Sequence, residues 1–105
     1  MEDFDVTRLL PKFKLTIGDF TPSSDLDEYY INFLKMAAAS LLENDISENV
    51  LKTELGDSTV VLHAKALMDG KDIASDPTLK LLRNTLSVKT KGERYADGKQ
   101  TDNNS

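Results

Sequence analysis

The chain has 105 residues, of which 39% are hydrophobic and 7% aromatic, and its net charge is −5. This length suits one domain with one modest core, built mainly from aliphatic side chains. The sequence has no cysteine and one histidine, which excludes a disulfide scaffold, a thiolate zinc site and a cysteine nucleophile. No apolar run approaches the roughly 18–20 residues of a membrane span, and the opening MEDFDV is acidic where a secretory signal is basic. We therefore expect a soluble protein that is not exported.

The charge is divided unevenly along the chain. Residues 1–57 hold 12 acidic and 5 basic side chains, whereas residues 58–105 hold 6 acidic and 8 basic ones. An acidic chain is a poor candidate for free nucleic-acid binding, which depends on lysine and arginine displacing the counterions of phosphates. The asymmetry favours a protein partner, and the alternative is a solvated surface with no binding role.

The first segment predicts a short helix capped by Asp5 or Thr7. Pro11 lies too far along for a first turn, so this helix is either very short or begins again at the proline. Gly18-Asp19 and Thr21-Pro22 are turn signals. Three apolar residues around these turns are expected to pack beneath the next helix: Leu15, Ile17 and Phe20.

Residues 24–44 form the longest segment able to make one uninterrupted helix. Ser24 is the predicted cap, and acidic residues in the first turn complement the helix dipole. The three alanines at 37–39 allow another backbone to approach closely. The predicted apolar face recurs at three- and four-residue steps and consists of Leu26, Tyr30, Phe33, Leu34, Ala37 and Leu41.

Two shorter helices are predicted next, over residues 48–55 and 58–69. Ser47 caps the first, with Ile46 and Leu51 placed as a hydrophobic staple and Gly56 at its C-terminal end. Asp57 or Ser58 caps the second, and Gly70 ends it. A strand over residues 59–63 is the competing interpretation, because three β-branched residues lie near the start of this segment.

Asp76-Pro77 is the clearest local signature, with aspartate as the cap and proline at the first helical position. The helix that follows is expected to bury Leu79, Leu82 and Leu86, with Leu81 widening the apolar stripe, and to end near Ser87 or Val88. Residues 89–105 have no aliphatic side chain larger than alanine. The sequence therefore predicts an all-α bundle of four to five helices over residues 1–88, with a flexible, extended, basic C-terminal arm over residues 89–105.

No arrangement of residues indicates catalysis or a bound cofactor. His63 has Thr59 and Leu67 four residues away on either side, neither of which binds metal, so a structural or surface role is expected. The acidic start of the long helix lacks the spacing and glycine of a calcium loop. We expect neither enzyme activity, nor a cofactor, nor a metal.

The helix pair over residues 48–69 also invites a helix-turn-helix interpretation. A recognition helix carries several polar or basic residues on its exposed face, and residues 58–69 offer only Lys65 and His63 against Asp69. Recognition of a DNA sequence is therefore not expected.

The stretch from Lys80 to Lys99 holds six basic and two acidic residues. A basic arm of this kind can order on an acidic protein surface, and tyrosine and arginine are frequent interface anchors; the alternative is a solvated tail. The candidate partner-binding residues are Tyr29, Arg83, Lys89, Lys91, Arg94 and Tyr95.

The order of elements resembles the small helical head–tail connector proteins of tailed bacteriophages, also called adaptor or head-completion proteins. The resemblance covers about residues 5–95 and rests on DVTRLLPKFKLTI, SSDLDEYYINFLKMAAASLLEN, VVLHAKALMDG and TLKLLRNTLSVK. It implies a virion protein, assembled in the host cytoplasm, that forms a ring of usually twelve copies beneath the portal after DNA packaging and joins head to tail.

Further implications of the resemblance concern the partners. These are the portal protein, which the C-terminal arm would reach, and neighbouring head-completion or tail proteins, with neither a membrane nor sequence-specific nucleic acid involved. The acidic N-terminal half would suit a conduit through which DNA slides. Pro11 and the absence of aromatic residues around Gly70 depart from the family pattern. The alternative function is that of a small helical DNA-binding or transcription-regulatory protein.

Overall fold

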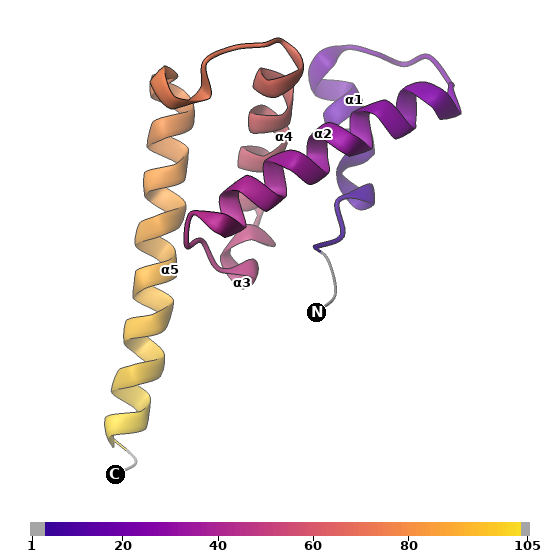
Figure 1. The fold of residues 1–105 in the computed structure, drawn as a ribbon. Helices are drawn as coiled ribbons and strands as arrows, with labels where there is room; N and C mark the ends of the chain where they lie inside the picture. Colours follow the sequence, from indigo (N-terminus) through magenta and orange to yellow (C-terminus); the bar gives the residue numbers. More distant parts are fainter. Residues whose placement is uncertain (1–3, 104–105) are drawn as a thin grey trace.

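The computed structural model describes residues 4–103, with side chains described as far as Tyr95, and this part of the chain contains helices and loops but no strand. Figure 1 shows five α-helices arranged as a small bundle, which confirms the predicted all-α class. No helix in the described range is both long and apolar enough to cross a membrane. The elements are η1 (Thr7–Leu9), α1 (Leu10–Ile17), α2 (Ser24–Glu43), α3 (Glu48–Leu51), α4 (Glu54–Met68), η2 (Ile73–Ser75) and α5 (Pro77–Asn103).

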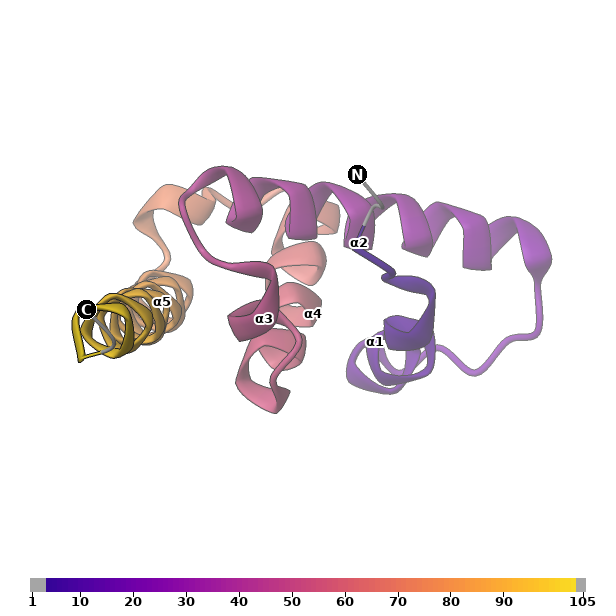
Figure 2. The same ribbon diagram turned by 90° about the horizontal axis from the view of Figure 1, so that it is seen from below.

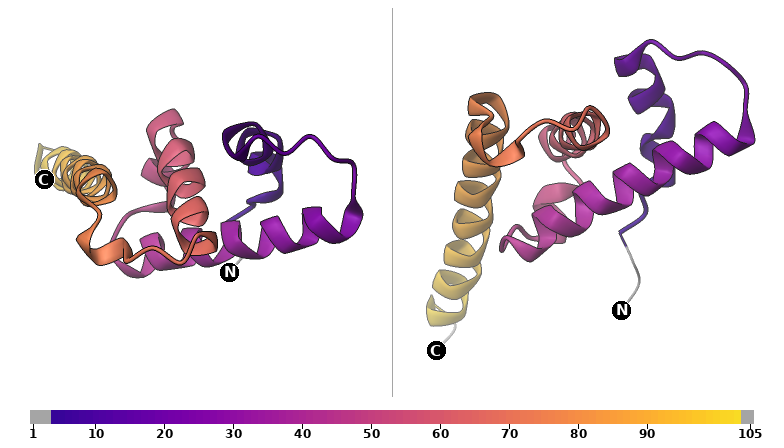
Figure 3. Two further views of the ribbon diagram at one scale, coloured as in Figure 1. Left: turned by 90° about the horizontal axis from the view of Figure 1, so that it is seen from above. Right: turned by 45° about the horizontal axis from the view of Figure 1, so that its top comes forward.

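The helices form a thin, elongated body. Helix α2 runs along one side, and α1, α3 and α4 line up against its other side (Figure 2). Helix α5 lies at one end, and the loop that leads into α2 lies at the opposite end (Figure 3). The molecule measures 56 × 30 × 20 Å, so its thinnest dimension is about two helix diameters.

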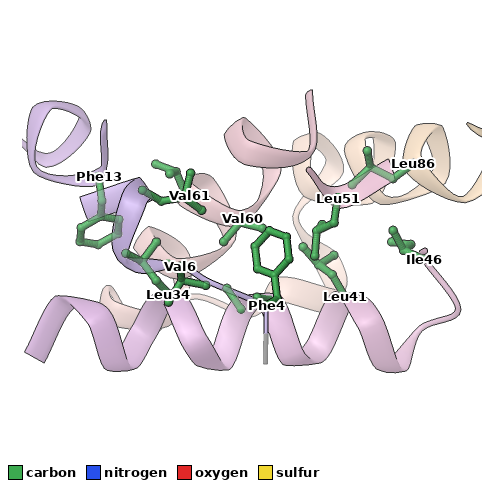
Figure 4. Close-up of a cluster of buried hydrophobic side chains, with 14 of the residues drawn as sticks. Phe4, Val6, Phe13, Leu34, Leu41, Ile46, Leu51, Val60, Val61 and Leu86 are labelled. Atoms are coloured by element: carbon green, nitrogen blue, oxygen red, sulfur yellow. The ribbon is translucent and has the colours of Figure 1, made fainter. Parts of the chain in front are cut away.

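Helix α2 supplies one wall of the core. Ser23, one residue before the predicted cap, accepts a hydrogen bond from the Leu26 backbone N–H. Four of the six residues on the predicted apolar face are buried, Phe33 packs at the edge of the core, and Leu26 is exposed. Side chains from α1, α3, α4 and α5 complete the same cluster (Figure 4). The buried members of α2 are Tyr30, Leu34, Ala37, Ala38 and Leu41.

The N-terminal segment begins again close to the proline, as one of the two alternatives predicted. Helix α1 starts at Leu10 after the η1 turn, and Pro11 sits in its first turn, where a missing N–H removes no helical hydrogen bond. The prediction that Leu15 and Phe20 pack beneath α2 is wrong, because both are largely exposed; Ile17 does pack against the core. Helix α1 is short and presents only one side to α2, and Phe13 is the buried residue on that side.

The α3–α4 junction corrects a predicted boundary. Ser47 caps α3 as expected, but α4 begins at Glu54 and is capped by Thr53, whose Oγ1 accepts from the Gly56 N–H at 3.2 Å. Gly56 thus lies in the first turn of α4 rather than at the end of the preceding helix. A Cβ at Gly56 would come within 2.2 Å of the Leu51 carbonyl oxygen. The glycine therefore permits the close approach of two backbones and does not supply a left-handed turn.

Helix α4 is the central helix of the bundle. The strand considered over residues 59–63 is wrong, since the β-branched residues in that stretch lie inside α4 and are buried. Arg8 fixes the N-terminal segment to the start of this helix through two hydrogen bonds to Asp57, at 2.8 and 2.9 Å. The helix ends at Met68, close to Gly70 as predicted, and Gly70 has a left-handed backbone (φ 70°).

Helix α5 is much longer than predicted. Asp76 caps it, as expected, by accepting from the Leu79 N–H at 3.1 Å. The helix does not end near Ser87 or Val88 but continues to Asn103. The predicted boundary between residues 88 and 89 falls inside this helix, so residues 89–95 are not an extended arm. A helix of 27 residues measures about 40 Å at 1.5 Å per residue.

Two contacts explain why the helix persists after its aliphatic residues end. The hydroxyl of Thr90 is buried; it accepts from the Ser47 N–H at 3.1 Å and donates to the Leu86 carbonyl at 2.9 Å. Arg94 pairs with Asp45, which has φ 66°, at 3.1 Å. The chain after residue 88 is thus held against the body by polar contacts that hydrophobic periodicity does not reveal.

Candidate interaction surface

The outward side of α5 carries a row of exposed apolar residues. Leu81, Val88 and Tyr95 are 66%, 68% and 71% exposed. Each follows the previous one by seven residues, which is a rotation of about −20° on an α-helix, so all three lie on one side. Leu79 and Leu86 are buried on the opposite side. Leu81 was expected to widen the buried stripe, and that expectation is wrong because Leu81 points away from the core.

Basic residues flank this row. Between Pro77 and Tyr95, α5 carries five basic residues and one acidic residue. Lys80, Lys89 and Lys91 are exposed. We call this surface the α5 outer face, and its members are Leu81, Val88, Tyr95, Lys80, Lys89 and Lys91.

The remaining basic residues of α5 in this range form contacts within the chain. Arg83 is half-buried and its guanidinium reaches the Ile73 carbonyl oxygen at 3.5 Å. The ion pair between Arg94 and Asp45 raises the pKa of Arg94 and lowers the pKa of Asp45. These contacts position α5 on the body. Of the candidate residues in α5, therefore, Lys89, Lys91 and Tyr95 lie together on the outer face, whereas Arg83 and Arg94 face the chain itself.

Tyr29, the sixth candidate, lies on another surface. It is 49% exposed on α2, and its ring meets that of Phe33 edge-on with centroids 5.0 Å apart. Met36, seven residues further on, is 53% exposed. Exposed acidic residues accompany them, so this side of α2 is apolar and acidic. We call this surface the α2 outer face, and its members are Tyr29, Met36, Glu28 and Glu43.

Three members of these faces were not predicted from the sequence: Leu81, Val88 and Met36. The signal that would have found them is the seven-residue spacing on a second side of each helix. On each helix the apolar pattern was interpreted as a single side that faces the core, so a second apolar side was not predicted.

His63 lies inside the bundle rather than at a surface. Its side chain is buried, and its Nδ1 has no hydrogen-bond partner among the residues that the structure describes. Burial lowers the pKa of His63, and the positive charge of Arg83 lowers that pKa further. The imidazole is therefore held in its neutral form, in keeping with the structural role predicted for it.

A shallow depression lies where α4 meets the start of α5. Its volume is about 110 Å³, below the roughly 300–1,000 Å³ of typical ligand sites. Of the polar residues that line it, Asp69 pairs with Lys65 at 3.0 Å and Asp76 caps α5. No group of three His, Cys, Asp or Glu residues placed to hold a metal occurs in the described part of the chain.

The fold and its surfaces define a small all-α protein with two exposed helical faces of opposite charge. Comparison with known proteins found no matching family model, no similar curated protein and no similar solved structure. The functional argument therefore rests on the residues and geometry of this chain.

Proposed function

We propose that this chain is a structural adaptor that assembles into a ring, as the head–tail connector proteins of tailed bacteriophages do, and joins a portal to the tail after DNA packaging. The α5 outer face is the observation that carries the proposal. An apolar row flanked by lysines along a long helix has no partner within the described chain, and exposed apolar rows with a polar rim are typical of assembly surfaces. The phage setting rests on the resemblance in helix order.

The shape of the molecule supports assembly as the mechanism. A body about two helices thick exposes much of its surface, and repeated contacts between copies would bury part of it. The α2 and α5 outer faces are separate and carry different charges. Separate, unlike surfaces are what head-to-tail contacts between copies require.

We propose no catalytic role. The one histidine is buried in its neutral form with no side-chain partner at Nδ1. The polar residues around the depression at the start of α5 cap helices or form ion pairs. These contacts support a structural rather than a catalytic role for the residues named.

The alternative regulatory function requires a helix that presents polar residues to DNA. Most of α4 is buried, and its Lys65 pairs with Asp69. α4 does not present the face that a recognition helix needs. A gel-shift assay with a DNA duplex, repeated at increasing salt, discriminates the two functions, because an adaptor gives no shift and a basic DNA-binding protein gives a shift that salt abolishes.

The direct test of the proposal is a native pull-down of the tagged chain from the cells that make it, with mass spectrometry of the captured proteins. An adaptor recovers a portal protein together with tail-completion proteins. Lys89→Glu combined with Lys91→Glu should reduce this recovery, whereas Lys52→Glu combined with Lys71→Glu, which changes the charge equally at exposed sites outside α2 and α5, should not. Recovery of polymerase subunits or DNA without capsid proteins would overturn the adaptor function and favour the regulator.

A further inference from the structure

We propose that the α5 outer face of one copy packs against the α2 outer face of a second copy, so that copies join head to tail. The inference rests on the proposed function, in which several copies assemble. It adds that the partner of the α5 outer face is another copy of this chain. Three observations support this choice of partner.

The two faces share one spacing. Leu81, Val88 and Tyr95 on α5, and Tyr29 and Met36 on α2, all repeat at seven residues and are about half exposed or more. Rows with this period stay in contact when two helices cross at about 20° in a left-handed sense. The row on α2 spans about two turns and the row on α5 about four, so the tyrosine and methionine of one copy can lie alongside two neighbouring residues of the α5 row of the next.

Charge selects the unlike pairing. Helix α2 exposes Asp25, Glu28 and Glu43 against one basic residue, Lys35, whereas the α5 outer face exposes Lys80, Lys89 and Lys91. Two α5 faces would repel each other, as would two α2 faces, because like charges brought together at an interface are costly. The combination of α2 with α5 places acidic and basic flanks side by side.

The two faces cannot meet within one copy. α2 forms one side of the body, and α5 lies at one end of the molecule (Figures 1 and 3). The side of α5 that contacts the body carries the buried residues Leu79, Leu86 and Thr90. A contact between different surfaces of two copies is heterologous, and repetition of it gives a closed ring or an open filament.

Gly92 adds to the case for a close helix–helix approach. It lies on α5 beside the outer row, between Val88 and Tyr95, and a Cβ built there would meet nothing within 4 Å. A glycine inside a helix lowers stability by roughly 0.5–1 kcal/mol relative to alanine. No contact in the described part of the chain requires this glycine, whereas a second backbone packed against α5 gains room from it.

Charge exchange tests the pairing in the purified full-length chain. One variant combines Lys80→Glu with Lys91→Glu on α5; the other combines Glu28→Lys with Glu43→Lys on α2. Sedimentation velocity over a range of protein concentrations, at low salt, should show association of the wild type that each variant weakens at least about tenfold. An equimolar mixture of the two variants should regain association, because each copy then meets the opposite charge on its neighbour.

The combined fourfold variant separates the proposed contact from an α5–α5 contact. With its charges exchanged on both faces it should associate like the wild type. A fourfold variant that stays monomeric, while the mixture of the two double variants associates, would overturn the head-to-tail pairing. Val88→Asp should abolish association, and Leu15→Asp, at an equally exposed site on α1, should leave it unchanged; circular dichroism verifies the fold of each variant.

Failure of this inference is distinguishable from failure of the proposed function. Association that ignores all of these charge changes, or a wild type that stays monomeric at every concentration tested, overturns the pairing of α2 with α5. Recovery of a portal protein by the wild-type chain in the pull-down tests the adaptor function whichever surfaces join the copies. The captured proteins therefore test the adaptor function, and the charge exchange tests the pairing of α2 with α5.

Discussion

Two glycines lie inside helices, and their surroundings are opposite in kind. Gly56 faces the Leu51 carbonyl so closely that a Cβ would lie 2.2 Å from the oxygen, whereas Gly92 has open space around it. Gly56→Ala should lower the free energy of unfolding by about 2–3 kcal/mol, because backbone must move to admit the methyl group. Gly92→Ala should raise it by roughly 0.5–1 kcal/mol through helix propensity. Urea titration followed by circular dichroism measures both, and equal effects would contradict the structure.

His63 predicts a specific pH dependence. Burial lowers its pKa in the folded protein from 6.5, so the unfolded chain binds the proton more readily than the folded chain. The contribution of His63 to stability is therefore fully present above about pH 6.5 and declines as the pH falls toward the lower folded pKa. Thermal melts at intervals between pH 8 and pH 5 should show a falling melting temperature.

His63→Leu provides the control for that titration, since it keeps an apolar side chain of similar size at a site where Nδ1 has no partner. The variant should lose most of the decline between pH 7 and pH 5. The lowered pKa values of Asp5, Asp19 and Asp45 place their effects at more acid pH, because a carboxylate with a depressed pKa loses its contribution only as it is protonated. An unchanged decline in the variant would assign it to other groups.

At the scale of elements, Thr90 connects α5 to the cap of α3. Thr90→Val keeps the shape but removes the oxygen that accepts from the Ser47 N–H. The unpaired N–H should cost about 1–3 kcal/mol of unfolding free energy. Thr85→Val is the matched control, because the Thr85 hydroxyl also donates to the carbonyl four residues earlier but accepts from no other element in the described contacts. Chemical denaturation should separate the two variants, and equal stabilities would refute the connecting role of Thr90.

The helices were predictable where one local signal decided them. Ser47 and Asp76 cap helices as predicted because a side-chain oxygen near an N–H is a short-range interaction. The start of α4 was predicted at Asp57 or Ser58 and not at Thr53, because Gly56 gave a local reason to end the preceding helix. The choice among them depends on the packing of Leu51 against Gly56, which is a contact between elements. The end of α5 was missed for the same reason, because Thr90 and Arg94 gain their partners only in the folded chain.

At the scale of the whole molecule, the accessible surface is larger than a compact monomer needs. The surface is 6709 Å², against about 5,900 Å² for a compact monomer of 11.7 kDa. The radius of gyration is 15.5 Å, against about 13 Å for a typical domain of this length. The excess accompanies the long α5, whose C-terminal end extends past the body of the molecule (Figure 1). Assembly with other chains would offset this exposure.

Truncation tests how much the C-terminal part of α5 contributes to the stability of the whole molecule. Removal of residues 96–105 leaves Thr90 and Arg94 with their partners, so it should leave thermal unfolding cooperative with a melting temperature near that of the full chain. Removal of residues 89–105 deletes both contacts. It should lower the melting temperature by about 4–20 °C, given roughly 4–8 °C per kcal/mol in a domain of this size. Indistinguishable melts would show that α5 after residue 88 adds nothing to the fold.

The candidate interaction surface was only partly predictable. The lysines and Tyr95 were found from composition, because basic residues gather late in the chain. The outer rows were not, since Leu81 and Val88 could each have been core residues until the buried side of α5 was known to be that of Leu79 and Leu86. Which apolar residues face outward is decided by the whole bundle and not by any one helix.

Arg94 makes the last described contact between α5 and the body, and the helix extends beyond it as a projecting segment. About nine residues separate Arg94 from the end of the helix at Asn103, a length of about 14 Å at 1.5 Å per residue. A bend of about 10° after Arg94 would displace the far end by about 2–3 Å and leave the Thr90 and Arg94 contacts with the body in place. Identical copies could in this way meet partners at slightly different positions, which is useful wherever two assemblies of unequal symmetry must be joined.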